Sequence, residues 1–208
     1  MLKVEIISDR NIVDECLDEL ARSSEVVLDL GGKRPFNKML AKYKHLFDNI
    51  SYFCLDICPN SGLSVVGDIQ NLPLKAESVD GVICHSVLEH VFEPQIAVRE
   101  IYRVLKPVGL GFFHIPFLYP YHGSADGKDC YRFTKDGLFY MFQDFEYMKI
   151  QPQDGYLGVT LRFLTGFRQI SKKVHFVERF LEKVITIFRR RGFNKMNNNS
   201  GFVFLVRK

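Results

Sequence analysis

The sequence predicts an α/β fold in which a parallel sheet is covered by helices on both faces. Over its 208 residues, short apolar runs typical of strands alternate with segments of helical periodicity. The early strand candidates, such as EVVLDL at 25–30, are almost continuously apolar, which is typical of strands buried on both faces. Ligands of such sheets bind beyond the carboxyl ends of the strands, so the residues that follow each strand are the first candidates for function.

Local signals define each expected element. Apolar residues of the segment 9–23 share one helical face, Pro94 suits the first turn of a helix, and Thr134 suits an N-cap. The expected helices are 9–23, 36–48, 93–105 and 134–143. The expected strands are 25–30, 51–57, 63–69, 78–86, 108–117, 145–151 and 201–208.

Composition indicates one globular domain over 1–208, with 1–25 as an N-terminal helical segment. The chain is 47% hydrophobic and 25% charged, which excludes disordered and collagen-like classes. Its five cysteines show no CxxC spacing, so we expect neither a disulfide framework nor a zinc site, and a reducing, cytoplasmic location. No signal peptide is expected, and the longest apolar stretch is too short for a membrane span.

Two adjacent glycines follow the first apolar strand. Asp29 ends that strand, and Gly31 and Gly32 allow a sharp turn with close approach of a ligand. The loop continues as Lys-Arg-Pro, so the GxGxxG fingerprint of dinucleotide-binding proteins is missing. A plain turn between a strand and a helix is the alternative interpretation.

Two further carboxylates come at the ends of the next strands. Asp56, followed by Ile57, can accept hydrogen bonds from a ribose diol. Asp68 can accept a hydrogen bond from an adenine amino group, with Ile69 against the ring. Each acid alone is more often a turn or capping residue, but three acids at three successive strand ends favour a nucleoside-binding edge.

The segment after the fourth strand contains His85, Ser86, Glu89 and His90. The spacing H-x-x-x-E-H is one residue longer than the H-x-x-E-H zinc motif, and it spans the end of a strand. The sequence therefore predicts no metal site.

The motifs LDLGG, CLDI, GDIQNLPLKAESVDGVICHSVLEHV and EIYRVLKPVGLGFFHIPF, over 26–116, resemble class I S-adenosylmethionine-dependent methyltransferases of the type-11 kind. The resemblance implies a Rossmann-like, doubly wound, seven-stranded sheet whose last strand, GFVFLVRK, is antiparallel. It implies S-adenosylmethionine as the cofactor. The family loop reads D/E-x-G-x-G-x-G, so this chain departs from it after Gly32.

The resemblance also assigns cofactor contacts to residues at the strand ends. The methionine part of the cofactor would lie against the glycine loop, the ribose against the acid of the second strand, and the adenine against the acid of the third. The residues implied are Asp29, Gly31, Gly32, Asp56, Ile57, Asp68, Ile69, His85 and Ser86.

The acceptor is expected beside the segment PFLYPYHGSADGKDCYRFT, which follows the fifth strand. It is similar to a stretch in methyltransferase-like proteins of bacterial surface-polysaccharide gene clusters. A hydroxyl acceptor must lose its proton, for which His122 is the natural general base and Asp129 a second candidate. The alternative is that His122 is a surface histidine and that Tyr119, Tyr121 and Tyr131 only pack the loop.

The segment 157–195 carries ten Lys or Arg and two Asp or Glu, hence +8, whereas the rest of the chain is −4. Its apolar spacing predicts a basic helical insertion. We consider a lid over the acceptor, a homodimer contact, and a peripheral contact with an anionic membrane face. Nucleic acid is disfavoured because no base-stacking motif accompanies the charge.

These observations together predict an S-adenosylmethionine-dependent methyltransferase that modifies a hydroxyl of a sugar or glycolipid intermediate. The alternative is a non-catalytic module with the same fold that binds the cofactor or docks to a membrane or a partner. A nicotinamide oxidoreductase is disfavoured by the missing GxGxxG.

Overall fold

The computed structural model describes residues 1–7, 11–36, 38–59, 63–123, 127–155, 159–160, 163 and 199–208. Apart from three residues, the basic segment 157–195 lies outside these ranges, so its helical character stays a prediction. Among the helices that are described, none is both long and apolar enough to cross a membrane.

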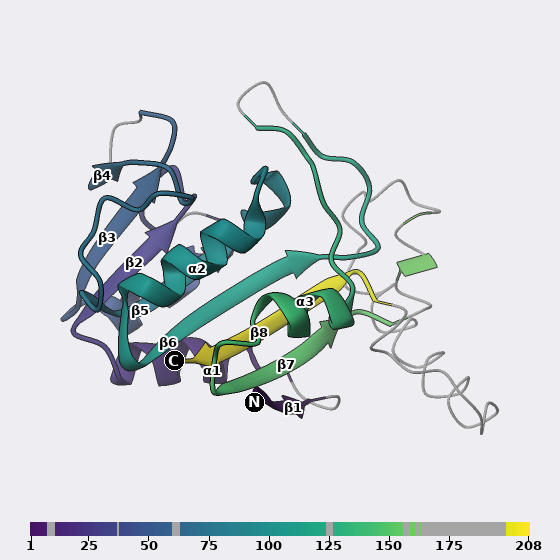
Figure 1. Cartoon of the computed structure of the whole chain (residues 1–208), viewed down its shortest axis with the longest axis horizontal. Helices are drawn as coiled ribbons and strands as arrows, with labels where there is room; N and C mark the ends of the chain where they lie inside the picture. The colour runs from purple at the N-terminus through teal and green to yellow at the C-terminus, as the bar shows by residue number, and fades with distance from the viewer. Residues whose placement is uncertain are drawn as a thin grey trace.

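Eight strands of the described chain form one mixed sheet in the order β1-β7-β8-β6-β5-β2-β3-β4 (Figure 1). Strand β8 is antiparallel to both of its neighbours, as expected for the last strand, and all other pairs are parallel. The strands are β1 (Lys3–Ile6), β2 (Val26–Leu30), β3 (Ser51–Asp56), β4 (Val65–Val66), β5 (Val79–His85), β6 (Leu105–Pro116), β7 (Tyr147–Gln153) and β8 (Gly201–Arg207).

The helices agree in place with the expected ones and are slightly shorter. Pro94 opens α2, where its missing N–H costs nothing, and the Thr134 side chain accepts a hydrogen bond from Gly137 N at 3.2 Å at the start of α3. The helices are α1 (Val13–Arg22), α2 (Pro94–Val104) and α3 (Lys135–Met141), and the 3-10 helices are η1 (Lys38–Phe47) and η2 (Leu88–His90).

The expected count of seven strands is wrong, because β1 adds an edge strand beside β7. Residues Lys3 and Ile6 pair in parallel with Tyr147 and Ile150. The strand is short and mostly exposed, so its sequence lacks the apolar run that marks a buried strand. The segment 1–25 thus begins with a strand and continues with helix α1.

The central strands divide the core between the two faces of the sheet. Helices α2 and α3 cover one face, and α1 and η1 cover the other (Figure 1). In β5, for example, Val82 and Cys84 belong to the first core and Ile83 to the second. This alternation follows from the two-residue period of strand side chains, and it explains why these strands are apolar on both faces.

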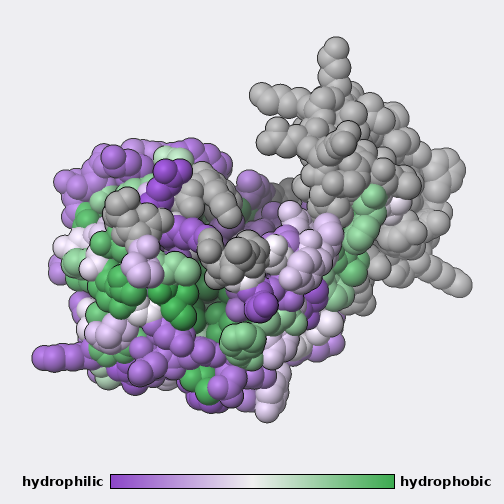
Figure 2. Space-filling model, turned by 90° about the horizontal axis from the view of Figure 1, so that it is seen from above, coloured by the Kyte–Doolittle hydropathy of each residue, from purple (hydrophilic) through white to green (hydrophobic). Residues whose placement is uncertain are grey.

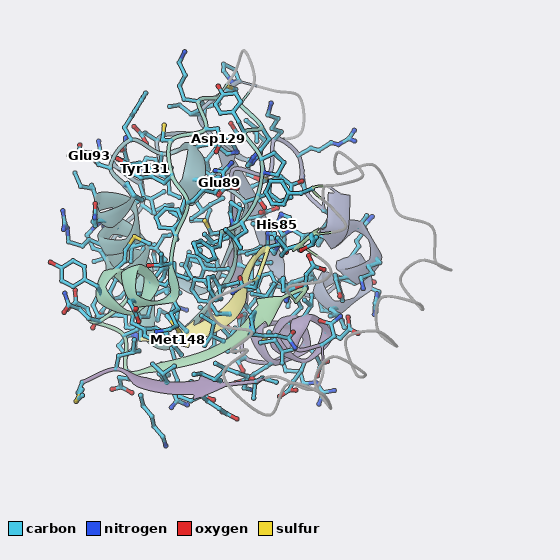
Figure 3. The ribbon with its side chains drawn as sticks, turned by 90° about the vertical axis from the view of Figure 1, so that its right-hand side faces the viewer. His85, Glu89, Glu93, Asp129, Tyr131 and Met148 are labelled. Atoms are coloured by element: carbon cyan, nitrogen blue, oxygen red, sulfur yellow. The ribbon has the colours of Figure 1, made fainter. Side chains whose placement is uncertain are left out.

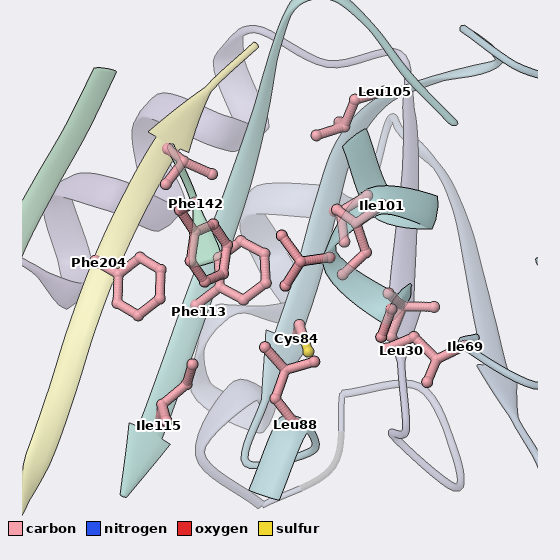
Figure 4. Close-up of a cluster of buried hydrophobic side chains, with 14 of the residues drawn as sticks. Leu30, Ile69, Cys84, Leu88, Ile101, Leu105, Phe113, Ile115, Phe142 and Phe204 are labelled. Carbon is pink, nitrogen blue, oxygen red and sulfur yellow. The ribbon is translucent and has the colours of Figure 1, made fainter. Parts of the chain in front are cut away.

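Phe113 lies at the centre of the first core (Figure 4). Its ring centroid is 4.8 Å from that of Phe142, the C-cap residue of α3, and 5.1 Å from that of Phe204 on β8. Aromatic pairs of this kind stabilise the packing of helix against strand by more than the burial of their area alone. The ring therefore connects α3 to the two strands at the middle of the sheet.

Replacing Phe113 by Ala should lower the free energy of unfolding by about 3–5 kcal/mol, because a large fully buried ring is lost and a cavity remains. Chemical denaturation measures the effect. Tyr140→Ala, on the exposed side of α3, is the matched control and should change stability by less than about 0.5 kcal/mol. Equal effects of the two substitutions would contradict the central position of Phe113.

Candidate functional site

The carboxyl ends of β3, β2, β5 and β6 meet at one edge of the sheet, because these strands are parallel neighbours. Gly31 N donates to Leu55 O at 2.7 Å, which aligns the turn after β2 with the end of β3. His85 and His114 are register partners at the ends of β5 and β6. The residues predicted at the strand ends are thus brought together here.

The turn after β2 requires both of its glycines. Gly31 has φ +70°, and a Cβ there would lie 2.5 Å from a methyl carbon of Val87. A Cβ on Gly32 would lie 2.8 Å from Oδ2 of Asp29. Lys33, which stands where the family loop has its next glycine, still adopts φ +54°. The loop therefore retains a left-handed backbone position without the glycine that usually provides it.

Asp29 is a buried carboxyl group beneath this turn. Tyr52 donates a hydrogen bond to its Oδ2 at 2.8 Å. Burial raises the pKa of Asp29 to about 7, the Tyr52 bond opposes the rise, and the negative charge of Asp56 adds to it. The carboxyl group is thus poised to ionise when a positive group comes close.

Asp56 connects the glycine turn to the end of β3. Its Oδ2 accepts a hydrogen bond from Lys33 N at 3.1 Å, and its Oδ1 accepts one from Cys58 N at 3.0 Å. A carboxylate has about four lone-pair sites, so two remain for a ligand. The adjacent residue Ile57 is 62% exposed. Its side chain is therefore accessible as an apolar surface for a ring of the ligand.

Asp68 and Ile69 occupy a tight turn after β4. The Oδ1 atom of Asp68 accepts a hydrogen bond from Gln70 N at 2.8 Å, which is typical of an Asx turn. Ile69 is buried in the core that contains Leu30 and Leu55. Little of its side chain remains for contact with a ligand, so Ile57 provides the larger apolar surface at this edge.

His85 and Ser86 lie beside a residue that the sequence reasoning missed. The His85 and His114 rings stack with centroids 4.6 Å apart, and Ser86 Oγ is 2.9 Å from Nδ1 of His114. Burial and the neighbouring His85 lower the pKa of His114 to about 3, so this ring is neutral. The position of His114 near the carboxyl end of β6 is the sequence feature that could have marked it as a site residue.

Glu89, His90 and His122, which we call the Glu89 cluster, meet above the ends of β5 and β6. Nε2 of His122 lies 3.6 Å from Oε1 of Glu89, and Nε2 of His90 lies 3.9 Å from the same atom. His85, which the sequence motif grouped with Glu89 and His90, stacks on His114 instead. Figure 3 shows Glu89 and Asp129 together, far from Met148 of β7.

Asp129 is held by Arg132 and by the backbone. The two terminal guanidinium nitrogens of Arg132, Nη1 and Nη2, donate to its carboxylate at 2.5 and 2.6 Å, and His122 N donates to it at 2.8 Å. The Arg132 bonds lower the pKa of Asp129 to about 2. A carboxylate so firmly ionised is a weak proton acceptor, but it fixes the backbone of His122.

Exposed aromatic and apolar side chains occur on the segments that follow the strand ends. The view from above shows hydrophobic residues among hydrophilic ones (Figure 2). The large exposed apolar residues on the segments that follow the strand ends are Ile57, Phe92, Tyr119, Tyr121 and Tyr131. Such a surface suits a ligand with both apolar and hydrogen-bonding faces.

Asp29→Asn should remove a pH dependence of stability. In the folded wild-type protein the pKa of Asp29 is raised, so folding favours its neutral form. The free energy of unfolding that this form contributes is fully present below about pH 4 and is lost as the pH rises towards 7. The stability of the variant relative to the wild type should therefore increase by roughly 4 kcal/mol between pH 4 and pH 8. Denaturation curves at several pH values test this. Tyr52→Phe should extend the loss to higher pH, whereas a difference that does not vary with pH would contradict the assignment.

The comparisons with known proteins agree with this architecture. Residues 35–113 match the methyltransferase domain family. None of the curated proteins compared with the chain matches its sequence.

Solved structures that share the fold include three methyltransferases. A SAM dependent methyltransferase from Archaeoglobus fulgidus has a TM-score of 0.56 at 15% identity, covering 91% of this chain and 89% of its own. The 1,6-didemethyltoxoflavin-N1-methyltransferase of Burkholderia thailandensis, with bound 1,6-didemethyltoxoflavin and S-adenosylhomocysteine, has 0.55 at 13%, covering 94% and 75%. A possible histamine N-methyltransferase from Thermotoga maritima has 0.53 at 17%, covering 93% and 88%. The chain therefore shares the fold of these methyltransferases.

Proposed function

We propose that the chain transfers a methyl group from S-adenosylmethionine to a hydroxyl of a sugar or glycolipid intermediate. The observation that carries the proposal is the edge formed by the carboxyl ends of three parallel strands beside a two-glycine turn. Asp29 lies near the end of β2, Asp56 ends β3, and Asp68 follows β4. The match of 35–113 to the methyltransferase domain family supports it.

The residues at this edge fit the cofactor. Gly32 lets the turn pack closely against the buried Asp29, since a Cβ at this position would lie 2.8 Å from Oδ2 of Asp29. In this proposal, the Asp29 carboxyl group provides the negative charge for the cationic amino group of the cofactor. Asp56 retains lone pairs for the ribose. We assign the adenine to Asp68, with the exposed Ile57 as an apolar surface at the same edge. The bound cofactor supplies an electrophilic methyl group on a sulfonium.

The acceptor lies, in this proposal, between the cofactor edge and the segment 117–133. Tyr119, Tyr121 and Tyr131 are all exposed there, and exposed aromatic rings suit the apolar faces of sugars. The resemblance of this segment to proteins of polysaccharide gene clusters favours the same acceptor class. Activation of the hydroxyl is assigned to the Glu89 cluster, with Asp129 in a positioning role through the backbone of His122.

A non-catalytic cofactor-binding module is the second candidate. Lys33 and Pro35 stand where the family loop has glycines, and this departure favours the candidate. Both functions require cofactor binding at the same edge of the sheet. They differ only in whether the methyl group is transferred to an acceptor.

Calorimetry with S-adenosylmethionine and with NAD is the first test, and binding of the first alone is expected. Methyl transfer from the radiolabelled cofactor to a panel of sugar and lipid-linked sugar acceptors is the second. NAD binding without S-adenosylmethionine binding would overturn the proposal. Cofactor binding without transfer to any acceptor would favour the module.

Asp56→Ala should weaken S-adenosylhomocysteine binding by about 10- to 150-fold, corresponding to about 1.5–3 kcal/mol for a charged hydrogen bond. The variant loses a ribose acceptor and the bond to Lys33 N that holds the glycine turn. Asp144→Ala, an exposed acid in the turn after α3, is the control and should bind as the wild type does. Unchanged affinity in a folded Asp56→Ala protein would remove Asp56 from the site.

A further inference from the structure

Glu89 is a buried carboxyl group without a hydrogen-bond partner among the described residues. Its side chain is 0% exposed, and within the described chain neither carboxylate oxygen has a hydrogen-bond partner. A buried charge normally requires a partner or a metal ion. The nearest polar groups are the two imidazoles of the cluster, and their distances of 3.6 and 3.9 Å exceed a hydrogen bond.

The three side chains are spaced as ligands of one ion. One ligand atom from each of Glu89, His90 and His122 lies within 4.8 Å of the others. Two ligands about 2.1 Å from a tetrahedral metal ion are about 3.4 Å apart, so small rotations of the side chains bring all three to bonding distance. We propose that Glu89, His90 and His122 bind a divalent first-row transition-metal ion.

The second ring nitrogen of His90 supports this assignment. Nδ1 of His90 lies 2.6 Å from Lys128 O, and a carbonyl can only accept, so Nδ1 carries the proton. With Nδ1 as the donor, Nε2 is the nitrogen available to an ion, and it lies 3.9 Å from Oε1 of Glu89. A metal ligand is typically oriented in this way by an acceptor on its other nitrogen.

His122 is oriented similarly by two acceptors. Its Nδ1 lies 3.2 Å from Pro120 O and 3.3 Å from Oδ2 of Asp129. Arg132 Nη2 also lies 3.3 Å from Nδ1, but the guanidinium group already donates to Asp129 and to three backbone carbonyls. The Nδ1 proton of His122 can therefore point to an acceptor while Nε2 faces Glu89.

The donor set determines the class of ion. Two imidazole nitrogens and one carboxylate oxygen suit Zn²⁺, Mn²⁺, Fe²⁺ or Co²⁺ better than Ca²⁺ or Mg²⁺, which prefer oxygen ligands. Three protein ligands leave at least one coordination position open. The spacing in the sequence predicted no metal, because it grouped Glu89 and His90 with His85 rather than with His122.

The open position gives the ion a role that rests on the proposed function. The His90 and His122 side chains are 28% and 31% exposed, so the accessible side of the cluster is theirs rather than that of Glu89. A hydroxyl oxygen of the acceptor bound there would lose its proton to solvent more easily, and this oxygen would then bond to the transferred methyl carbon as the bond from carbon to sulfur breaks. His122 would act as a metal ligand rather than as a free base.

Metal binding is tested on the whole chain carrying Cys130→Ser, which removes the exposed thiol near the cluster. After treatment with a chelator, Co²⁺ is titrated by absorption spectroscopy and Zn²⁺ by calorimetry. One equivalent of each should bind. Glu89→Gln, His90→Ala and His122→Ala should each weaken binding at least tenfold, whereas Glu93→Gln and His45→Ala should not. Binding that survives in the three cluster variants, or no binding at all, would overturn the site.

Thermal unfolding gives a readout that does not depend on activity. Without metal, Glu89→Gln should unfold at the same or a higher temperature than the parent, because a buried acidic group without a hydrogen-bond partner is replaced by a neutral amide of the same size. Added Zn²⁺ should stabilise the parent and not this variant. Equal stabilisation of both proteins would contradict the site even if other variants failed to fold.

S-adenosylhomocysteine binding in the same samples separates the site from the proposed function. The cluster variants should retain cofactor affinity, since none of the three residues lies in the glycine turn or at Asp56. Metal binding without transfer to any acceptor would overturn the acceptor role of the ion and leave the site standing. Equal transfer by chelated and metal-loaded protein would overturn the role of the ion and leave the methyltransferase function standing.

Discussion

The in-register parallel pairing of β3, β2, β5 and β6 is the constraint on which the rest of the structure depends. It brings four strand ends to one edge, and with them Gly31, Asp56, His85 and His114. A slip of one residue would turn each side chain to the other face of the sheet and move apolar residues out of both cores. The packing of the two cores therefore fixes the position of the polar edge, although no core residue takes part in its chemistry.

The glycine turn shows how tightly backbone and site are coupled. Gly31 packs against Val87, which lies just beyond β5, and Asp56 at the end of β3 binds the backbone of Lys33. The turn is thus held from both neighbouring strands. This explains how Lys33 can adopt a left-handed conformation that glycine usually provides: the surrounding bonds determine the backbone and offset the modest strain.

Two buried acids mark the two ends of the proposed site. Asp29 lies under the glycine turn with the Tyr52 hydroxyl as its partner, and Glu89 lies under two imidazoles. Burial of a carboxyl group opposes ionisation and does not favour folding. Groups that cost stability are typical of functional sites, where a ligand supplies the missing charge. At Asp29 this ligand would be the cationic cofactor, and at Glu89 the proposed ion.

The sequence by itself determined the α/β class, the position of nearly every helix and strand, and the acids at the strand ends, because period and capping are local properties of the chain. Pro94 and Thr134 are examples, since each acts within one helical turn. Only the tertiary structure decided that β1 adds an edge strand, that Asp56 holds the glycine turn, and that His114 stacks on His85. It also decided the Glu89 cluster, because His122 comes from a distant segment that is tied to η2 by backbone bonds from Cys130 and Tyr131 to Glu89 O. Such contacts depend on how loops from distant parts of the chain pack together, and the spacing of residues in the sequence does not predict them.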